Sequence, residues 1–214
     1  MPGLQYTIYV KNMSSETFKQ TDKKTEAEVP KKKFVHLLDT EEVEVKRLDN
    51  EDIEDCVKVM RKCAFDVTEV EVGNIIAYGK SFGATVNRML VGVGLAWPAK
   101  LELDRKVITS GEPNALYQED PAVLLAYEGR GVRRILLNER EKEAMASGLK
   151  YTIGYLYEDI PKGNIADYIT EAGSALEKLY LSEDYEFFRT EKGILAFKNL
   201  SKSRPEAGKA NPAE

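Results

Sequence analysis

The segment from Tyr127 to Leu137 constrains the fold more than any other, because it joins an apolar stretch to a helix through two glycines and three arginines. Glycine lets the backbone come close to an anion, and the first N–H groups of a helix have no partner within the helix. Arg130, Arg133 and Arg134 would crowd the positive end of the helix dipole, which is unfavourable unless an anion binds there. We therefore expect a strand–turn–helix unit with an anion site. The alternative is a plain tight connection whose arginines are screened by neighbouring acids and solvent.

The composition is that of a soluble globular chain of 214 residues, of which 43% are hydrophobic and 31% charged. Asp and Glu number 36 against 31 Lys and Arg, so the chain lacks the basic excess of proteins that coat nucleic acid. No apolar run reaches the roughly 18 residues of a membrane span. The first residues also lack the basic region and apolar stretch of a secretory signal. We therefore expect a cytoplasmic protein that spans no membrane and for which nucleic acid is a poor candidate partner.

Histidine and cysteine are scarce, which excludes several chemistries. His36 is the one histidine, and Cys56 and Cys63 are the two cysteines. A hydrolase with a Ser-His-Asp or Cys-His arrangement would have to use His36, and a zinc site needs three or four ligands at close spacing. Cys56 and Cys63 follow a helical pattern in which seven residues rise about 10 Å, too far for a disulfide. We expect both to be reduced, small apolar residues, and we expect no metal site.

The chain divides into three parts. Residues 1–42 hold an alternating strand pattern from Leu4 to Val10 and then a polar linker, and residues 43–200 form the main domain. Residues 201–214 are rich in Pro, Gly, Ala and charged residues, which predicts a disordered tail. The first strand could extend the sheet, lie on the surface or pair with a second subunit in a homodimer.

The hydrophobic periodicity of residues 43–200 predicts an α/β or α+β domain with a mixed, mostly antiparallel sheet flanked by helices. Asp49 or Asn50 is expected to cap the first helix. The expected helices are Ile53–Ala64, Thr68–Lys80, Asn138–Ser147 and Ile165–Leu181. The expected strands are Val43–Leu48, Met89–Trp97, Leu101–Ile108, Leu116–Leu124, Tyr151–Tyr157, Tyr185–Phe188 and Ile194–Leu200. Pro121 is expected to interrupt the strand Leu116–Leu124, because proline has no N–H to donate.

A second glycine pair, Gly92 and Gly94, lies within the expected strand Met89–Trp97. No helix follows it, so close packing or a bulge is a better interpretation than a phosphate loop.

Residues Tyr117-Gln-Glu-Asp-Pro-Ala-Val-Leu-Leu-Ala-Tyr-Glu-Gly-Arg-Gly-Val-Arg-Arg-Ile-Leu-Leu137 resemble the coenzyme-A-binding core of the GCN5-related N-acetyltransferases, the GNAT superfamily. The segment from Val43 to Met60 is similar to the family's opening strand and first helix, and Ala175 to Phe187 is similar to its closing segment. The resemblance covers roughly residues 43–200 and implies an acyl-CoA N-acyltransferase-like fold. It also implies transfer of an acetyl group from acetyl-CoA, the cosubstrate, to a primary amine by direct attack.

The resemblance implies site residues as well. The backbone of the central strand would bind the pantetheine arm, and the following loop would hold the pyrophosphate; by position the residues are Ala122, Val123, Leu124, Gly129, Arg130, Gly131, Val132, Arg133 and Arg134. Glu119 or Asp120 would deprotonate the incoming amine, a task suited to a carboxylate. Tyr180 would protonate the leaving thiolate, because a tyrosine carries its proton at neutral pH.

Two loop residues differ from the family pattern, since Glu128 stands where Arg or Gln is usual and Arg133 where Gly or Ala is usual. An acetyltransferase-like module without catalysis, which binds or regulates, is therefore a second hypothesis. A sensor of anions or nucleotides that uses the arginine-rich helix start is a third. The acceptor amine is not defined by the sequence.

Overall fold

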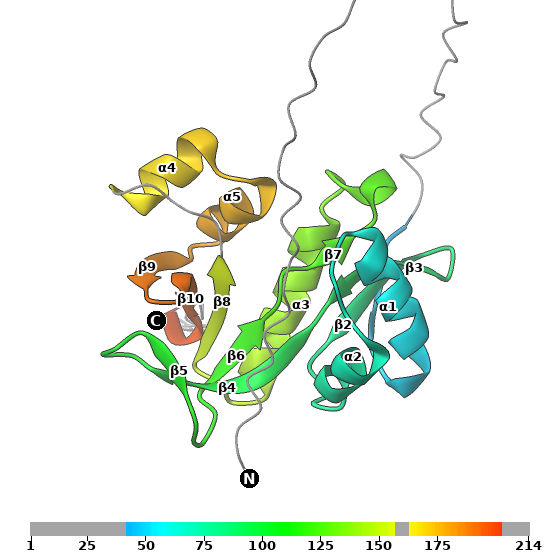
Figure 1. The fold of residues 1–214 in the computed structure, drawn as a ribbon, viewed down its shortest axis with the longest axis horizontal. Helices are drawn as coiled ribbons and strands as arrows, with labels where there is room; N and C mark the ends of the chain where they lie inside the picture. Colours follow the sequence, from blue (N-terminus) through cyan, green and yellow to red (C-terminus); the bar gives the residue numbers. More distant parts are fainter. Residues whose placement is uncertain (1–41, 157–162, 203–214) are drawn as a thin grey trace, which may run out of the picture.

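The computed structural model describes residues 42–156 and 163–202. The expected strand Leu4–Val10, the polar linker, His36 and the tail beyond Lys202 lie outside the described residues. Within them the chain forms two neighbouring, mostly antiparallel sheets, one of four strands and one of six, with helices on both faces (Figure 1). The two sheets follow one another as a bent layer and are called its N-terminal and C-terminal parts. This architecture confirms the predicted fold class.

The first strand and first two helices follow local sequence signals. After β1 (Glu44–Arg47), Asp49 caps a short 3-10 helix and forms a capping box with Asp52. Helix α1 (Ile53–Lys62) then buries its apolar face, which consists of Cys56, Val57, Val59 and Met60. Helix α2 (Glu69–Ile76) starts at a second capping box, between Thr68 and Glu71, and ends four residues before the expected Lys80. Both cysteines are free.

The N-terminal part of the sheet has the strand order β1-β2-β3-β7. Strand β2 (Phe82–Val86) is not among the expected strands, and it pairs antiparallel with β3 (Met89–Gly94). The two are joined at Asn87 and Arg88, which both have positive φ angles of 50° and 66°. A two-residue hairpin of this kind usually carries glycine, so its signal in the sequence is weak.

The C-terminal part of the sheet has the strand order β5-β4-β6-β8-β10-β9. Its strands are β4 (Ala96–Glu102), β5 (Val107–Thr109), β6 (Ala115–Gln118), β8 (Tyr151–Leu156), β9 (Glu186–Thr190) and β10 (Gly193–Asn199). The expected strand Leu101–Ile108 is wrong, because the chain turns between β4 and β5 and Lys106 there has a φ of 53°. The predicted closing hairpin is confirmed as β9 and β10.

Two expected strands break at the same place, where the two parts of the sheet separate. Met89–Trp97 divides at Leu95 into β3 and β4, and Leu116–Leu124 divides between Gln118 and Ala122 into β6 and β7 (Ala122–Val123). Pro121, which has no N–H to donate, lies within the second break. Across the gap the Glu119 N–H still donates to the Leu95 carbonyl at 3.0 Å. We call these two points the strand breaks.

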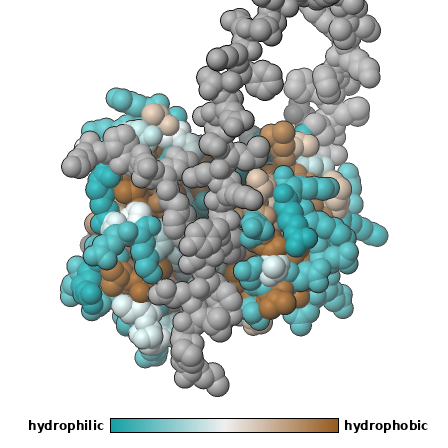
Figure 2. Space-filling model, in the orientation of Figure 1, coloured by the Kyte–Doolittle hydropathy of each residue, from teal (hydrophilic) through white to brown (hydrophobic). Residues whose placement is uncertain are grey.

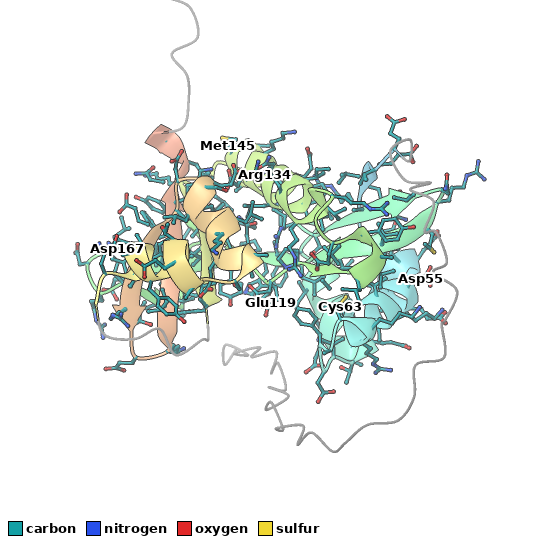
Figure 3. The ribbon with its side chains drawn as sticks, turned by 90° about the horizontal axis from the view of Figure 1, so that it is seen from above. Asp55, Cys63, Glu119, Arg134, Met145 and Asp167 are labelled. Carbon is teal, nitrogen blue, oxygen red and sulfur yellow. The ribbon has the colours of Figure 1, made fainter. Side chains whose placement is uncertain are left out.

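Helix α3 (Val132–Ala146) lies against one face of the sheet, and α1 and α2 lie against the other, as Figures 1 and 3 show. Helix α3 begins six residues before the expected Asn138, because Val132 already belongs to its buried face with Leu136 and Arg140. This packing accounts for the glycine pair in β3. A Cβ on Gly92 would lie 2.9 Å from Val132 Cγ1, and one on Gly94 would lie 3.1 Å from Arg140 Nε. Close packing is therefore confirmed, and the β2–β3 register also shifts at this point.

The expected helix Ile165–Leu181 is two helices, α4 (Ile165–Ala172) and α5 (Ala175–Ser182). The chain bends at Gly173, and Ser174 caps α5 in a capping box with Glu177. The bend turns α5 toward the start of α3.

Five large hydrophobic side chains are exposed among the described residues: Val70, Tyr78, Met89, Leu125 and Met145. On the face drawn in Figure 2, hydrophobic areas interrupt a largely hydrophilic surface. Of the helices in residues 42–156 and 163–202, none has the length and apolar character needed to cross a membrane.

Candidate active site

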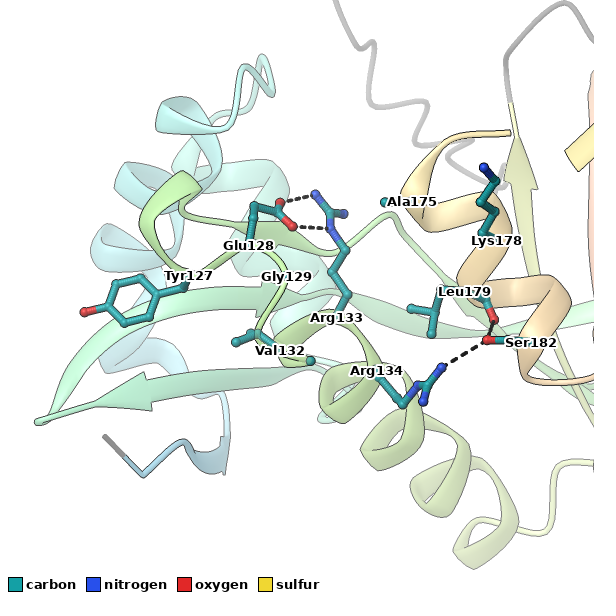
Figure 4. A pocket seen from close by; sticks show the side chains of 11 residues that line it. Tyr127, Glu128, Gly129, Val132, Arg133, Arg134, Ala175, Lys178, Leu179 and Ser182 are labelled. Carbon is teal, nitrogen blue, oxygen red and sulfur yellow. Dashed lines mark hydrogen bonds and ion pairs between the residues drawn. The ribbon is translucent and has the colours of Figure 1, made fainter. Parts of the chain in front are cut away.

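A pocket of about 350 Å³ opens between the start of α3 and helix α5 (Figure 4). One wall is the loop after β7, with Tyr127, Glu128, Gly129 and Gly131. The other wall is the face of α5 that carries Ala175, Lys178, Leu179 and Ser182. The pocket thus lies at the positive end of the α3 dipole, where an anion is favoured.

Both glycines of the loop have the left-handed backbone conformation, with φ angles of 75° at Gly129 and 79° at Gly131. Gly131 is the N-cap of α3 and offers no side-chain cap to the first N–H groups of the helix. A Cβ built on either glycine would meet nothing within 4 Å. The glycines therefore leave space over the backbone that is open toward the pocket.

Arg133 forms an ion pair with Glu128 across the glycine turn. Its Nη2 lies 2.5 Å from Oε1 of Glu128, and its Nε lies 3.1 Å from Oε2. The remaining nitrogen, Nη1, donates to the Pro121 carbonyl at 2.7 Å, which ties the loop to the second strand break. The negative charge of Glu128 beside the expected anion site is thus paired with a cation.

The other two arginines of the loop also contact protein groups. Arg134 Nε lies 2.9 Å from Glu183 Oε1, and its Nη2 donates to Ser182 Oγ at 3.1 Å. The Arg130 guanidinium lies 5.0 Å from the centre of the Tyr127 ring. Two acids, Glu128 and Glu183, therefore screen part of the positive charge. Glu139, a further acid of α3, pairs with Lys142 instead.

Glu119 lies at the second strand break, at the centre of the molecule (Figure 3). Its side chain is buried, with 6% exposed. Burial raises the pKa of Glu119 to about 8; the charge of neighbouring Asp120 adds to the rise, and Arg140 opposes it. A carboxyl with this pKa can take and release a proton near neutral pH.

Tyr180 lies on α5 and is fully buried against Tyr185, with the two ring centres 4.7 Å apart. Its hydroxyl has no hydrogen-bond partner among the described residues. A Cβ on Gly154 of β8 would lie 2.9 Å from this hydroxyl and 3.1 Å from the Gln118 carbonyl, so the hydroxyl reaches the gap between β6 and β8. Burial, with Asp120 adding to it, raises the pKa of Tyr180, which keeps the hydroxyl protonated.

The three backbone positions expected to face the cosubstrate differ from one another. The Leu124 N–H donates to the Val91 carbonyl at 2.9 Å, and Ala122 pairs with Val93. Because backbone groups alternate along an antiparallel ladder, the groups of Val123 face away from β3. The Val123 carbonyl accepts from Cys63 Sγ at 3.2 Å. Burial raises the pKa of that thiol, with Arg133 opposing, so the thiol remains protonated at neutral pH.

The site also contains residues that sequence reasoning missed. Lys178 and Ser182 of α5 line the pocket, and Arg140 of α3 donates to the Glu119 carbonyl at 2.7 Å. Lys178 and Ser182 are four residues apart, the spacing of one helix face, which would have pointed to them once the start of α5 was recognised. No cluster of three or more His, Cys, Asp or Glu that could hold a metal lies in the described part of the chain.

No model of a known protein family matches the sequence, and no curated protein matches it. Solved structures match the fold. The loading GNATL domain of CurA from Lyngbya majuscula is 15% identical, with a TM-score of 0.59 over 75% of this chain and 99% of that chain. The paia N-acetyltransferase from Thermoplasma acidophilum, solved in complex with coenzyme A, is 15% identical, with a TM-score of 0.54 over 74% and 99%.

The ribosomal-protein-S18-alanine N-acetyltransferase from Escherichia coli is also 15% identical, with a TM-score of 0.52 over 78% of this chain and 97% of that chain. At this identity the similarity is one of fold. The chain therefore has the GNAT superfamily fold, as the resemblance of residues 117–137 implied.

Proposed function

We propose that this chain is an acyl-CoA-dependent acyltransferase, and specifically an N-acetyltransferase that moves an acetyl group from acetyl-CoA to a primary amine. The observation that carries the proposal is the pocket at the start of α3, with the open backbone of Gly129 and Gly131 in one wall. Coenzyme A bound to the Thermoplasma acidophilum structure supports the same cosubstrate for this fold.

The residues present fit the cosubstrate. The free N–H groups at the start of α3 and the open space above both glycines suit a pyrophosphate. Lys178, whose side chain lines the pocket, adds a cation on the α5 side. The backbone of Val123, which faces away from β3, would bind the pantetheine arm. Bound acetyl-CoA supplies the thioester that is the acyl donor.

Glu119 is proposed as the general base. A primary amine arrives as an ammonium ion and must lose a proton before it can attack. A buried carboxyl with a pKa of about 8 is ionised in part at neutral pH and holds the proton well once it has accepted it. Asp120, next along the chain, acts on Glu119 through its charge.

Tyr180 is proposed as the general acid. Its buried hydroxyl, without a partner among the described residues, is available to give its proton to the departing sulfur. In the whole reaction one C–N bond replaces one C–S bond. The nitrogen loses two protons, of which one passes to Glu119 and the other replaces the proton that Tyr180 gave to sulfur.

A thermal melt with excess acetyl-CoA, free CoA or ATP tests the proposal. Ligand at about 100 times its Kd adds about 2.7 kcal/mol to the free energy of unfolding. For a chain of this size the melting temperature should rise by roughly 5–10 °C. A rise with acetyl-CoA and CoA, followed by acetylation of an amine from a panel, is the expected result.

Other outcomes point to the alternatives. A rise with acetyl-CoA but no transfer to any amine would favour a binding module without catalysis. An equal rise with ATP would favour a sensor of anions, and no rise with millimolar ligand would contradict the proposal.

A further inference from the structure

Arg140 is a fully buried arginine at the centre of the molecule. It lies on the face of α3 that packs against the sheet, and its side chain has 0% exposure. Its Nε donates to the carbonyl of Leu136, one turn earlier in the same helix, at 3.1 Å. The guanidinium therefore extends from α3 into the sheet.

The guanidinium binds both strand breaks. Nη1 donates to the Leu95 carbonyl at 3.0 Å and to the Glu119 carbonyl at 2.7 Å. Since the Glu119 N–H also donates to the Leu95 carbonyl, at 3.0 Å, these three residues form a closed hydrogen-bonded set. One side chain of α3 thus holds the backbone of the proposed base.

This arrangement is costly for stability. Among the described residues, Arg140 donates only to the backbone carbonyls of Leu136, Leu95 and Glu119, and its Nη2 is buried there without a partner. Desolvation of a charge that has no hydrogen-bonded carboxylate is unfavourable, and apolar side chains of similar volume often replace such groups without loss of stability. Arg140 also constrains position 94 of β3 to glycine, because a Cβ there would lie 3.1 Å from Arg140 Nε.

Four titratable groups surround the guanidinium. Glu119 and Asp120 lie at the second strand break, Tyr180 lies on α5, and Tyr185 immediately precedes β9. The charge of Arg140 lowers the pKa of Glu119 and the pKa of Tyr180, against the larger effect of burial on each. The cation therefore acts on both groups proposed for proton transfer.

We propose that Arg140 is a positioning residue for the acyl transfer, which fixes the Glu119 backbone at the strand break and supplies the buried positive charge that the two proton-transfer groups share. This inference rests on the proposed function for its role in turnover. Its electrostatic part is a property of the protein without ligand, so it can be tested separately.

The experiment compares two variants. Arg140→Met keeps most of the side-chain volume and removes the charge, whereas Arg140→Lys keeps the charge and loses the planar guanidinium with its several N–H donors. The titration of Glu119 is followed in the ligand-free protein by carbon-13 NMR of its side-chain carboxyl. In Arg140→Met the midpoint should move up by at least about half a pH unit, since a nearby cation favours the ionised form. In Arg140→Lys it should stay near that of the wild type.

Turnover provides the second measurement. Arg140→Met should lower kcat about tenfold or more and leave the KM for acetyl-CoA within about twofold, the signature of an interaction that matters in the transition state. Gly94→Ala, which crowds Arg140 without removing it, should move kcat in the same direction and serves if Arg140→Met does not fold.

An unchanged Glu119 midpoint in a folded Arg140→Met variant would overturn the inference, and so would an unchanged kcat in a folded Gly94→Ala variant. A change only in melting temperature, with kcat unchanged, would likewise reduce Arg140 to a structural role. If the wild type binds no acetyl-CoA, the proposed function fails, while the NMR titration still tests the electrostatic role of Arg140.

Discussion

Arg133 and Glu128 form an ion pair across the glycine turn, in which the guanidinium donates two hydrogen bonds of 2.5 and 3.1 Å to the carboxylate. A carboxylate beside a pyrophosphate site is repulsive, and a long side chain beside a glycine turn can crowd it. In this protein each of these residues offsets the effect of the other. A third bond, from Arg133 to the Pro121 carbonyl, holds the pair against the strand break.

The two partners should respond in opposite directions to substitution. Arg133→Leu leaves Glu128 unpaired, so acetyl-CoA should bind about tenfold more weakly or worse. Glu128→Gln removes the negative charge, so the Kd should stay equal or fall. Calorimetric titration measures both, and the double variant, with neither charge, should bind more tightly than Arg133→Leu. Equal weakening in both single variants would contradict the electrostatic argument.

Gly131→Asn should abolish acetyl-CoA binding without unfolding the protein. Asparagine tolerates the left-handed conformation better than most residues, and its side chain would fill the open space where the ligand is proposed to bind. Gly148→Asn is a matched control, because Gly148 has a φ of 73° and equally open surroundings at the other end of α3. Similar loss of binding in both variants, measured by calorimetry, would argue against the pyrophosphate site.

Tyr180→Phe should slow turnover and leave the protein as stable as the wild type or more so. The hydroxyl is buried without a partner among the described residues, and such a group costs about 1–3 kcal/mol. The Kd for acetyl-CoA should not change. A lower melting temperature with unchanged kcat would assign Tyr180 to the core instead.

The acid limb of kcat/KM should follow the ionisation of Glu119. Its pKa is raised to about 8, so the rate should rise with pH and level off above that value. Glu119→Gln should lower the rate about a hundredfold and remove this limb. Asp120→Asn should move the limb to lower pH, because the Asp120 charge contributes to the rise. A limb that stays in place in both variants would exclude Glu119 as the base.

Glu143 should stabilise the fold at neutral pH and cease to do so in acid. Partial burial opposes its ionisation, but hydrogen bonds from Arg47, Lys80 and Ser147 outweigh that effect and lower its pKa to about 2. A depressed pKa in the folded state gives stability that is present above the usual carboxyl pKa and is lost as the pH falls toward 2.

Urea denaturation measures the effect. Glu143→Gln should lower the free energy of unfolding by about 1–3 kcal/mol at pH 7, and the difference should shrink by pH 3. Glu139→Gln is the control. Among the described residues Glu139 pairs only with the exposed Lys142, so this substitution should cost less than about 0.5 kcal/mol.

Local signals predicted the ends of several elements. Asp49 or Asn50 was expected to cap the first helix, and Asp49 does provide a cap, although for the short 3-10 helix that leads into α1. The Ser174-Ala-Leu-Glu177 capping box was also present in the sequence, and attention to it would have separated α4 from α5. The pocket wall on α5 was missed for this reason. Lys178 and Ser182 line the pocket because the chain bends at Gly173, and a single continuous helix would not have indicated that bend.

The sequence indicated one of the two strand breaks but not the other. Pro121 was expected to interrupt Leu116–Leu124, and it lies in the break between Gln118 and Ala122. Leu95 lies inside a continuous apolar run, in which Gly92 and Gly94 indicated close packing or a bulge but not the end of a strand. Its carbonyl is bound by Arg140, a residue 45 positions further along the chain. In the same way, Glu128 and Arg133 looked like two independent departures from the family pattern, and only the geometry of the turn shows that they pair.

Packing against α3 requires glycine at positions 92 and 94 of β3, since neither residue has a left-handed backbone that would require it. The identities of positions 92 and 94 therefore depend on residues some 40 positions later in the sequence, Val132 above Gly92 and Arg140 above Gly94. Among related chains, a shorter side chain at position 140 should permit alanine or serine at position 94, and the two positions should covary. The glycine pair that resembles a phosphate loop is thus a consequence of the helix that packs over it.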